Sequence, residues 1–494
     1  GSYEVKVVML GYSPLTQTVV VPAPTPRAVL FQLQLKPFTL NEIVATGVTD
    51  PIQGSKLPFT VGRISGEEVN AAPASGSVLT ALQGKVAGVS IAQTTGHPGE
   101  EPDILLRSPT SIQDSNAPMI VVDGVILAST YTNSSVDITA MDIESIEVVK
   151  GAAAASLYGS RAASGVIQIR TRRGNALPEG TTRISARSEF GMSQAPTDLP
   201  LARHHYFVTN EKGEFLDSNG QVTNDPARRV IEADRIMDNA YGVPLYDNVA
   251  TFFRPGRYMS NSVTLSQNSE ATNFSLSIVD SHEQGSLEAN DGYRNRSFRI
   301  NLDHRLADDF TLSASAYHSR GYREMVSGSP YFNLLSYSPE VDLGKKGPDG
   351  KYLQQPDPMV AVENPIWYQT TRDNEQRRLR TLANAQARYA PLPWLTFTGV
   401  LSYDRTDLTT ELYTPKGTPL SLTGGNVSTG ELRKTHNGVD ALNGQISANL
   451  MHTFGDLTAR LNLAALQERE KNDFMMARGL DFYVPEVPSL DAAG

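Results

Sequence analysis

The sequence contains no cysteine at all. This absence excludes a disulfide-stapled scaffold, a zinc site with Cys ligands and catalysis by a thiol. The sequence also lacks any apolar run near the roughly 20 residues that a membrane-spanning helix requires, and its richest stretch, residues 151–158, is far shorter. Helical integral membrane proteins are therefore excluded.

Positive charge is also in short supply. The 494 residues include 43 Lys and Arg against 53 Asp and Glu, which gives a formal net charge of −10. Because an acidic chain repels phosphate backbones, we expect no nucleic-acid partner. Hydrophobic residues make up 39% of the chain, too large a share for a disordered protein.

Familiar catalytic motifs are missing as well. His282-Glu283 lacks the second histidine of a zinc-binding HExxH motif. Residues 344–351 carry glycines and lysines at the wrong spacing for a phosphate-binding loop, and His204-His205 has no third metal ligand placed nearby. No GxSxG nucleophile elbow is present. We therefore expect no enzymatic activity, no metal site and no cofactor.

From about residue 180 onward, polar and apolar residues alternate. The candidate strands run over roughly 9 to 13 residues each, the length that a tilted strand needs to cross a bilayer. In the clearest case, residues 297–303, one face is apolar and the other polar: Phe298, Ile300 and Leu302 against Arg299, Asn301 and Asp303. The pattern predicts about nine or ten strands before the end of the sequence.

The connections between these strands alternate in length. Short turns near 268–271, 307–309, 391–393 and 454–456 are separated by long connections at about 193–256, 284–293, 322–375 and 409–436. Outer-membrane barrels have this asymmetry, with tight periplasmic turns and long outer loops. The alternative is a soluble β-sandwich or propeller. Loops of this length are uncommon in compact soluble domains, and the Arg, Asn and Asp of the polar face suit a wet lumen, so we favour the barrel.

The residues before 180 show other sequence patterns. Residues 1–36 alternate like a small β module, and 37–50 form a short β-prone segment between turn residues. Residues 51–174 read as a compact α/β region with strands near 119–124, 143–149 and 166–170. Glycines 151, 159 and 165 indicate tight turns there.

Three ordered blocks in the α/β region resemble a known family: Pro118–Val125, Asp142–Gly151 and Ala154–Gly174. They are similar to the plug of SusC/RagA-type TonB-dependent transporters. The segment 40–47 looks like the TonB box that precedes the plug, and residues 1–36 resemble the end of a carboxypeptidase-regulatory-like β-sandwich extension. By this resemblance the chain is an N-terminal half.

The resemblance implies a mainly β architecture in four parts. These are the extension (1–36), the TonB box and linker (37–50), the α/β plug (51–174) and the first part of a transmembrane antiparallel β-barrel (175–494). The barrel part would hold about nine or ten of about 22 strands, enough in the whole protein to enclose a plugged lumen.

The resemblance also implies roles for particular residues. The TonB box is the segment Leu40, Asn41, Glu42, Ile43, Val44, Ala45 and Thr46, which could add a strand to a sheet edge of TonB; the alternative is an ordinary interdomain strand. We expect polar plug–barrel contacts from Asp142, Glu144, Glu147, Lys150 and Arg161, although each could equally lie on a solvated face. Asp123-Gly124 most simply makes a turn after a buried strand.

Ligand contacts are expected on the plug top and the outer loops. Loop aromatics offer flat faces on which sugar rings could stack, and local packing is the alternative: Tyr331, Phe332, Tyr337, Trp367 and Tyr368. The function implied is TonB-dependent import of an oligosaccharide or peptide across the bacterial outer membrane. The implied partners are TonB with ExbB/ExbD, a SusD-like surface lipoprotein and outer-membrane lipid. The alternatives are a siderophore- or cobalamin-type receptor, and a structural or adhesive barrel.

Overall fold

The chain forms two compact units, Gly1–Ala45 with Pro51–Thr60 and Thr46–Asp50 with Val61–Gly494. The computed structural model describes residues 2–7, 15–20, 43–44, 52–53, 61–71, 77–93, 95–112, 115–128, 143–195, 202–225, 228–357, 362–420, 426–454, 457–485 and 487–493. The first unit contains two antiparallel pairs: β1 (Ser2–Val7) with β2 (Leu15–Val20), and β3 (Ile43–Val44) with β4 (Ile52–Gln53).

The second unit is dominated by one nine-stranded antiparallel sheet, which we call the wall. Its strands follow one another in the order of the chain, apart from two short strands that pair inside a long loop. In order they are β12 (Thr181–Ser193), β15 (Gly256–Asn268), β16 (Thr272–Gln284), β17 (Tyr293–Ala307), β18 (Phe310–Glu324), β19 (Asp373–Leu392), β20 (Leu395–Thr414), β21 (Glu431–Phe454) and β22 (Leu457–Leu480). The predicted number of strands is confirmed.

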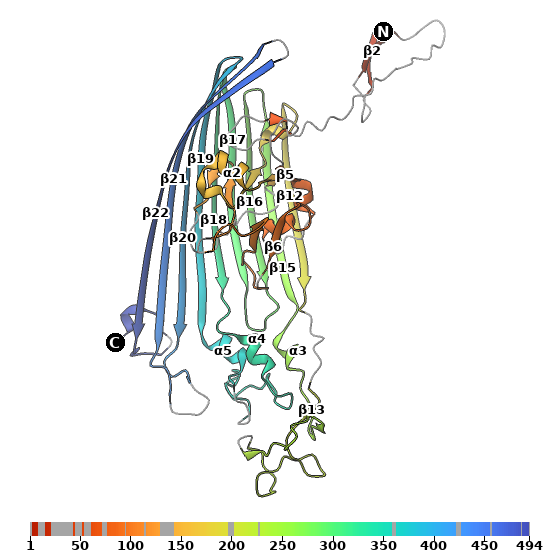
Figure 1. Ribbon diagram of the computed structural model, residues 1–494, viewed down its shortest axis with the longest axis vertical. Coiled ribbons are helices and arrows are strands. Elements are labelled where there is room, and N and C mark those ends of the chain that lie inside the picture. The colour runs from red at the N-terminus through yellow and green to blue at the C-terminus, as the bar shows by residue number, and fades with distance from the viewer. Residues whose placement is uncertain are drawn as a thin grey trace. The chain divides into compact units, whose positions relative to one another are not determined.

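The connections alternate as the sequence predicted. Short turns join β15 to β16, β17 to β18 and β19 to β20, while 194–255, 285–292, 325–372 and 415–430 form the long connections. The long loops gather at one end of the wall, with the helices α3 (Asn248–Phe252), α4 (Pro330–Leu335) and α5 (Pro365–Thr371) (Figure 1). Among the described residues, no helix is long and apolar enough to cross a membrane.

The wall is apolar outside and polar inside. On β17, Phe298 is 42% exposed and Ile300 is 38% exposed, whereas Arg299 is 4% and Asn301 1% exposed. A water-soluble sheet buries the opposite set. Exposed apolar side chains continue across the register on the neighbouring strand, for example Ile278, which is 54% exposed and lies opposite Phe298. This inversion is typical of a strand wall with lipid on one side and a polar interior on the other.

The strands are longer than the sequence predicted. They range from 13 residues in β12 to 24 residues in β21 and β22, where the alternation had indicated roughly 9 to 13. The extra length is polar on the outer face, because alternation continues past the apolar band. Hydrogen bonds and ion pairs between neighbouring strands stabilise this polar extension.

Residues 61–174, which we call the plug, lie against the polar face of the wall (Figure 1). A five-stranded sheet has the order β5 (Val61–Ser65), β10 (Ile143–Val149), β11 (Val166–Thr171), β8 (Met119–Val122) and β9 (Val125–Ile126). Only β8 and β11 pair in parallel. Outside this sheet are the antiparallel pair β6 (Val89–Ala92) and β7 (Asp103–Leu106) and the helices α1 (Gly66–Asn70) and α2 (Ala152–Tyr158).

The plug strands are almost continuously apolar because both faces of this sheet are covered. Ile143, Ile146, Ile167 and Ile169 are completely buried. The core that they form also includes two side chains from the wall, Tyr317 and Leu382. Helix α1 begins at Ser65 with a capping box, in which the Ser65 and Glu68 side chains bond to each other's backbone N–H groups.

Candidate functional site at the plug–wall interface

The turn between β8 and β9 places a carboxylate against the wall. Asp123 and Gly124 both have positive φ, 48° and 87°, as a tight two-residue hairpin requires. The Asp123 carboxylate accepts hydrogen bonds from the backbone N–H (2.9 Å) and hydroxyl (2.5 Å) of Thr171. It also lies 3.3 Å from Arg299 of β17, and both side chains of this ion pair are at most 5% exposed. The turn was predicted, but its contact with the wall was not.

A second buried ion pair lies on β19 and β20. Arg380 donates to both carboxylate oxygens of Asp404, at 3.2 and 2.8 Å, and the two side chains are 5% and 1% exposed. The same carboxylate accepts a hydrogen bond of 3.0 Å from the backbone N–H of Ala128 in the plug. Nearby, the Asn443 side chain donates to the carbonyl of Ile126 at 3.5 Å. The segment that follows β8 is thus held by hydrogen bonds to two neighbouring wall strands, β20 and β21.

The end of the plug is fastened to β17. Arg173 pairs with Asp303 at 2.5 Å, and the Asn301 side chain donates to the Arg172 carbonyl at 2.7 Å. At Gly174 an added Cβ would lie 2.3 Å from a backbone oxygen of β15 and 2.6 Å from one of β16. Only glycine lets the two backbones approach this closely.

The predicted plug–wall contacts are distributed unevenly. Arg161 lies 3.1 Å from Glu468 and 3.5 Å from Glu470, both on β22. Glu147 is buried within the plug, 3.9 Å from Arg63. Of these two predicted residues, Arg161 thus contacts the wall and Glu147 is paired within the plug.

The other three residues predicted to contact the wall are Lys150, Glu144 and Asp142. Lys150 donates to the Ala87 carbonyl within the plug, and its pKa is lowered by partial burial and by the neighbouring Arg107. Glu144 is exposed on the plug sheet and lines a cavity next to the wall. Asp142 lies outside the described residues.

The structure describes two residues of the predicted TonB box. Ile43 and Val44 form β3 and pair with β4. The remaining predicted residues lie outside the described part of the chain: Leu40, Asn41, Glu42, Ala45 and Thr46. The role of this segment stays a prediction.

The loop aromatics fall into two groups. Tyr337 and Trp367 are 8% and 7% exposed. The Tyr337 hydroxyl donates to a backbone carbonyl at 3.2 Å, and burial raises the pKa of this tyrosine. Phe332 is 69% and Tyr331 48% exposed, and Tyr368 is half-buried with a guanidinium stacked over its ring. Local packing therefore accounts for Tyr337 and Trp367, whereas Tyr331 and Phe332 keep an accessible face.

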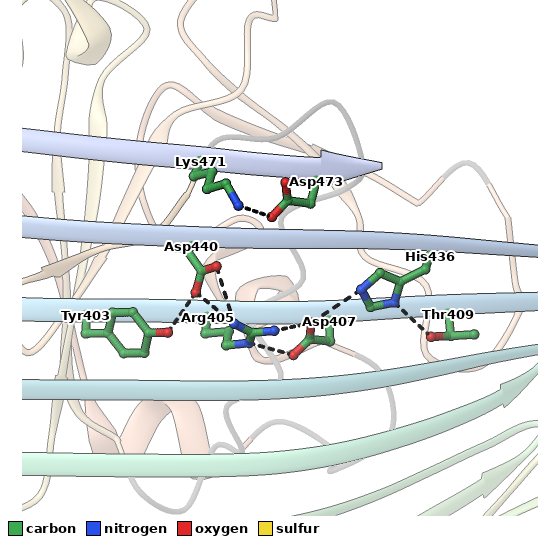
Figure 2. Close-up of polar contacts among 8 residues, drawn as sticks. All are labelled: Tyr403, Arg405, Asp407, Thr409, His436, Asp440, Lys471 and Asp473. Atoms are coloured by element: carbon green, nitrogen blue, oxygen red, sulfur yellow. Dashed lines mark hydrogen bonds and ion pairs between the residues drawn. The ribbon is translucent and has the colours of Figure 1, made fainter. Parts of the chain in front are cut away.

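The outer face of β20 to β22 carries a polar collar next to the apolar band. Figure 2 shows Arg405 bridging Asp407, at 2.9 Å, and Asp440, at 3.3 Å. The Tyr403 hydroxyl donates to Asp440 at 2.7 Å, and His436 lies 3.6 Å from Asp407. The collar marks where these strands pass from apolar to polar surroundings. In the described part of the chain, no group of three or more His, Asp or Glu is placed to hold a metal ion.

Comparison with known proteins supports the family resemblance seen in the sequence. Residues 53–166 match the model of the TonB-dependent receptor plug domain. The chain is 28% identical over 358 residues to TonB-dependent receptor P26 of Formosa agariphila and 25% identical over 358 residues to TonB-dependent receptor SusC of Bacteroides thetaiotaomicron. The plug-domain match and these relatives support a SusC/RagA-type TonB-dependent receptor. The resemblance seen in the sequence is thereby confirmed.

Solved structures of TonB-dependent receptors have the same fold. A chain of the RagAB peptide importer in the open-open state matches with a TM-score of 0.69 at 18% identity, over 92% of this chain and 52% of that one. The unliganded ferric citrate transporter FecA matches with a TM-score of 0.55 at 11% identity. The matches cover 72% of this chain and 34% of P26, and 69% of this chain and 35% of SusC. The chain therefore spans about a third of these receptors' length.

Proposed function

We propose that this receptor imports a nutrient across the bacterial outer membrane with energy delivered through TonB. The observation that carries the proposal is the chemistry of the plug–wall interface. Asp123–Arg299 and the Arg380–Asp404–Ala128 contact are buried but polar. A transporter of this kind must seal its lumen at rest and release the seal when pulled, and it needs no catalytic group.

Polar contacts suit this task better than apolar ones. A buried ion pair contributes little net stability, because desolvation offsets the attraction between the charges. Water that enters during movement solvates the separated charges again, whereas exposed apolar surface would gain nothing from it. The interface is thereby closed at rest and able to exchange its contacts for water.

The segment 40–46 is the proposed handle. An extended strand with free backbone groups can add to the edge of a sheet in TonB, and the main-chain hydrogen bonds then transmit force without side-chain chemistry. We propose TonB, energised by ExbB/ExbD, as the periplasmic partner. The apolar outer face of the wall, with Phe298 and Ile300 exposed, supports a location in the outer membrane.

We further propose a SusD-like surface lipoprotein as the outer partner and an oligosaccharide or peptide as the cargo. The proposal is supported by the relatives, which include SusC and the RagAB peptide importer. On the chain itself, Tyr331 and Phe332 present accessible rings in the long loops, and Tyr368 remains a candidate whose ring is stacked under Arg372. Such rings stack on sugar faces or on peptide side chains.

Two measurements test these partners. Capture by the purified periplasmic domain of TonB should be lost when residues 40–46 are deleted and when Ile43 is replaced by Pro, which blocks strand addition. The conservative Ile43→Val variant should keep it. Isolation of the native receptor from outer membranes should yield a SusD-like lipoprotein in equal amount. Capture that survives both disruptive changes, or recovery of the receptor alone, would refute the corresponding partner.

A further inference from the structure

A cavity of about 550 Å³ separates the plug from one side of the wall. This volume lies within the roughly 300–1,000 Å³ of small-molecule sites. The plug side is formed by α1 and the end of the sheet, including Asn70 and Glu144, and the wall side by β12, β15 and β16. The inward side chains there are mostly small hydroxyls, among them Ser185, Ser262, Thr264, Ser275 and Ser277.

The sheet register explains why space is left here. Ser185 lies opposite Thr264, which lies opposite Ser277, so three short side chains form a row across three strands. The next residue of this row, on β17, is Arg299, which reaches the plug and pairs with Asp123. Along this row, the boundary between the cavity and the ion-paired contacts therefore runs between β16 and β17.

Strands β17 to β22 of the wall are bonded to the plug through side chains. From β17 to β22 the plug contacts Arg299, Asp303, Asp404 and Glu468 through ion pairs or hydrogen bonds of 2.5–3.3 Å. On β12, by comparison, Arg187 reaches the Asn70 carbonyl at a long 3.4 Å. The plug is thus attached asymmetrically.

The cavity offers hydrogen bonds but little net charge. Its lining contains five arginines and two glutamates. Three of these arginines are paired with acids outside the lining: Arg173 with Asp303, Arg299 with Asp123 and Arg187 with Glu189. Positive and negative charges are therefore equal in number around the cavity.

One hydroxyl of the wall is available to hydrogen-bond a solute in the cavity. Ser277 lines the cavity and is 4% exposed, and its hydroxyl has no hydrogen-bond partner among the described residues. A buried hydroxyl without a partner is costly, so this position favours a ligand that donates or accepts hydrogen bonds.

We propose that the transported solute passes along this side of the plug, between α1 and strands β12, β15 and β16. The ion pairs to β17–β22 exchange their contacts for water less readily, so this side widens first. The passage takes an uncharged segment rich in hydroxyl or amide groups, the chemistry that a sugar chain and a peptide backbone share. The route rests on the proposed import function.

Cysteine labelling can test the route, because the chain has no cysteine of its own. Ser277→Cys places a thiol in the cavity, and Ser402→Cys places one on the inner face of β20, where the serine is 2% exposed. The full-length receptor would be treated in cells with N-ethylmaleimide, with TonB active or deleted. We expect Ser277→Cys to react about tenfold faster with active TonB, as for a site exposed by local opening, and Ser402→Cys to stay slow in both. Equal rates with and without TonB, or equal acceleration at both positions, would overturn the route.

Charged reagents test the class of solute. Neutral, anionic and cationic methanethiosulfonates would be compared at Ser277→Cys. The reaction rate of each reagent would be divided by its rate with a free thiol in solution. We expect the normalised reaction rate of each charged reagent to lie within about fivefold of the rate of the neutral reagent. A fivefold difference is what one uncompensated charge about 8 Å away would cause at an effective dielectric constant of about 40. A larger preference for either sign refutes the uncharged solute. TonB capture by the unlabelled variants reports on the import function separately, so loss of the route and loss of the function are distinguishable.

Discussion

Removing Arg299 should loosen the plug from the wall. In Arg299→Met the Asp123 carboxylate stays buried and loses its cation. At 3.3 Å and an effective dielectric constant of about 20, the lost attraction is about 5 kcal/mol. The two hydrogen bonds from Thr171 remain, so we expect a net cost of about 3 kcal/mol, at the low end for breaking a buried pair.

The Thr171 amide reports on this change directly, because it donates to Asp123 at 2.9 Å. A cost of about 3 kcal/mol corresponds to roughly a hundredfold larger population of the open state. Hydrogen exchange of the purified full-length receptor should therefore show the Thr171 amide exchanging roughly a hundredfold faster. Arg299→Lys, which keeps the charge, should show a smaller increase.

A matched control lies on the same strand. Arg296 pairs with Asp280 at 2.7 Å, but these side chains are 80% and 55% exposed, so Arg296→Met should cost less than about 1 kcal/mol. The double variant Asp123→Asn with Arg299→Met should recover part of the loss, because no buried charge is left unpaired. Unchanged exchange at Thr171 in Arg299→Met, or equal acceleration in Arg296→Met, would refute the reasoning.

Three further changes probe other parts of the molecule. Gly174→Ala should lower the free energy of unfolding by about 1–3 kcal/mol through overpacking against two wall strands, as measured by thermal unfolding. The control Gly444→Ala, with no atom within 4 Å of the added Cβ, should be nearly neutral. Equal effects of the two substitutions would contradict the close packing at Gly174. Trp367→Ala should lower the free energy of unfolding by about 3–5 kcal/mol and make the loop 325–372 sensitive to proteolysis. The control Phe332→Ala, at a side chain that is exposed in the structure, should leave proteolysis unchanged. Equal cleavage of the two variants would contradict the packing assigned to Trp367. The pKa of Tyr158 is raised by burial and by a neighbouring carboxylate, so its contribution to stability is complete below pH 10 and is lost as the pH rises further. In Tyr158→Phe the free energy of unfolding should therefore fall less steeply above pH 10. An unchanged pH dependence would exclude Tyr158 as the source of the fall.

Local pattern predicted the wall well. Alternation alone placed Arg299, Asn301 and Asp303 on one face of a strand, and the structure buries that face against the plug. The same pattern underestimated strand length. Period-two alternation shows where a strand meets lipid, but polar extensions such as the collar around Arg405 depend on partners in neighbouring strands, which a single segment does not reveal.

The plug–wall contacts were harder to predict, because they depend on how two folded parts dock. Asp123 was predicted as a turn residue, and its sequence neighbours give no sign of Arg299, 176 positions away. Glu147 and Lys150 are charged residues in a plug motif, yet their contacts described here lie within the plug. A charge in the sequence indicates that a buried residue needs a partner. Which residue becomes that partner depends on how the plug docks against the wall strands.

The plug sheet also has a mechanical consequence. The chain enters it at Val61, opposite Val149, and leaves it after Thr171, opposite Ile143. These two points lie at opposite ends of β10, the strand between them. Since antiparallel hydrogen bonds run perpendicular to the strands, tension between the two points loads the β5–β10 ladder in shear, with its bonds sharing the load. The plug sheet should therefore resist stretching as a unit, so that a pull moves the whole body before it unravels the first strand.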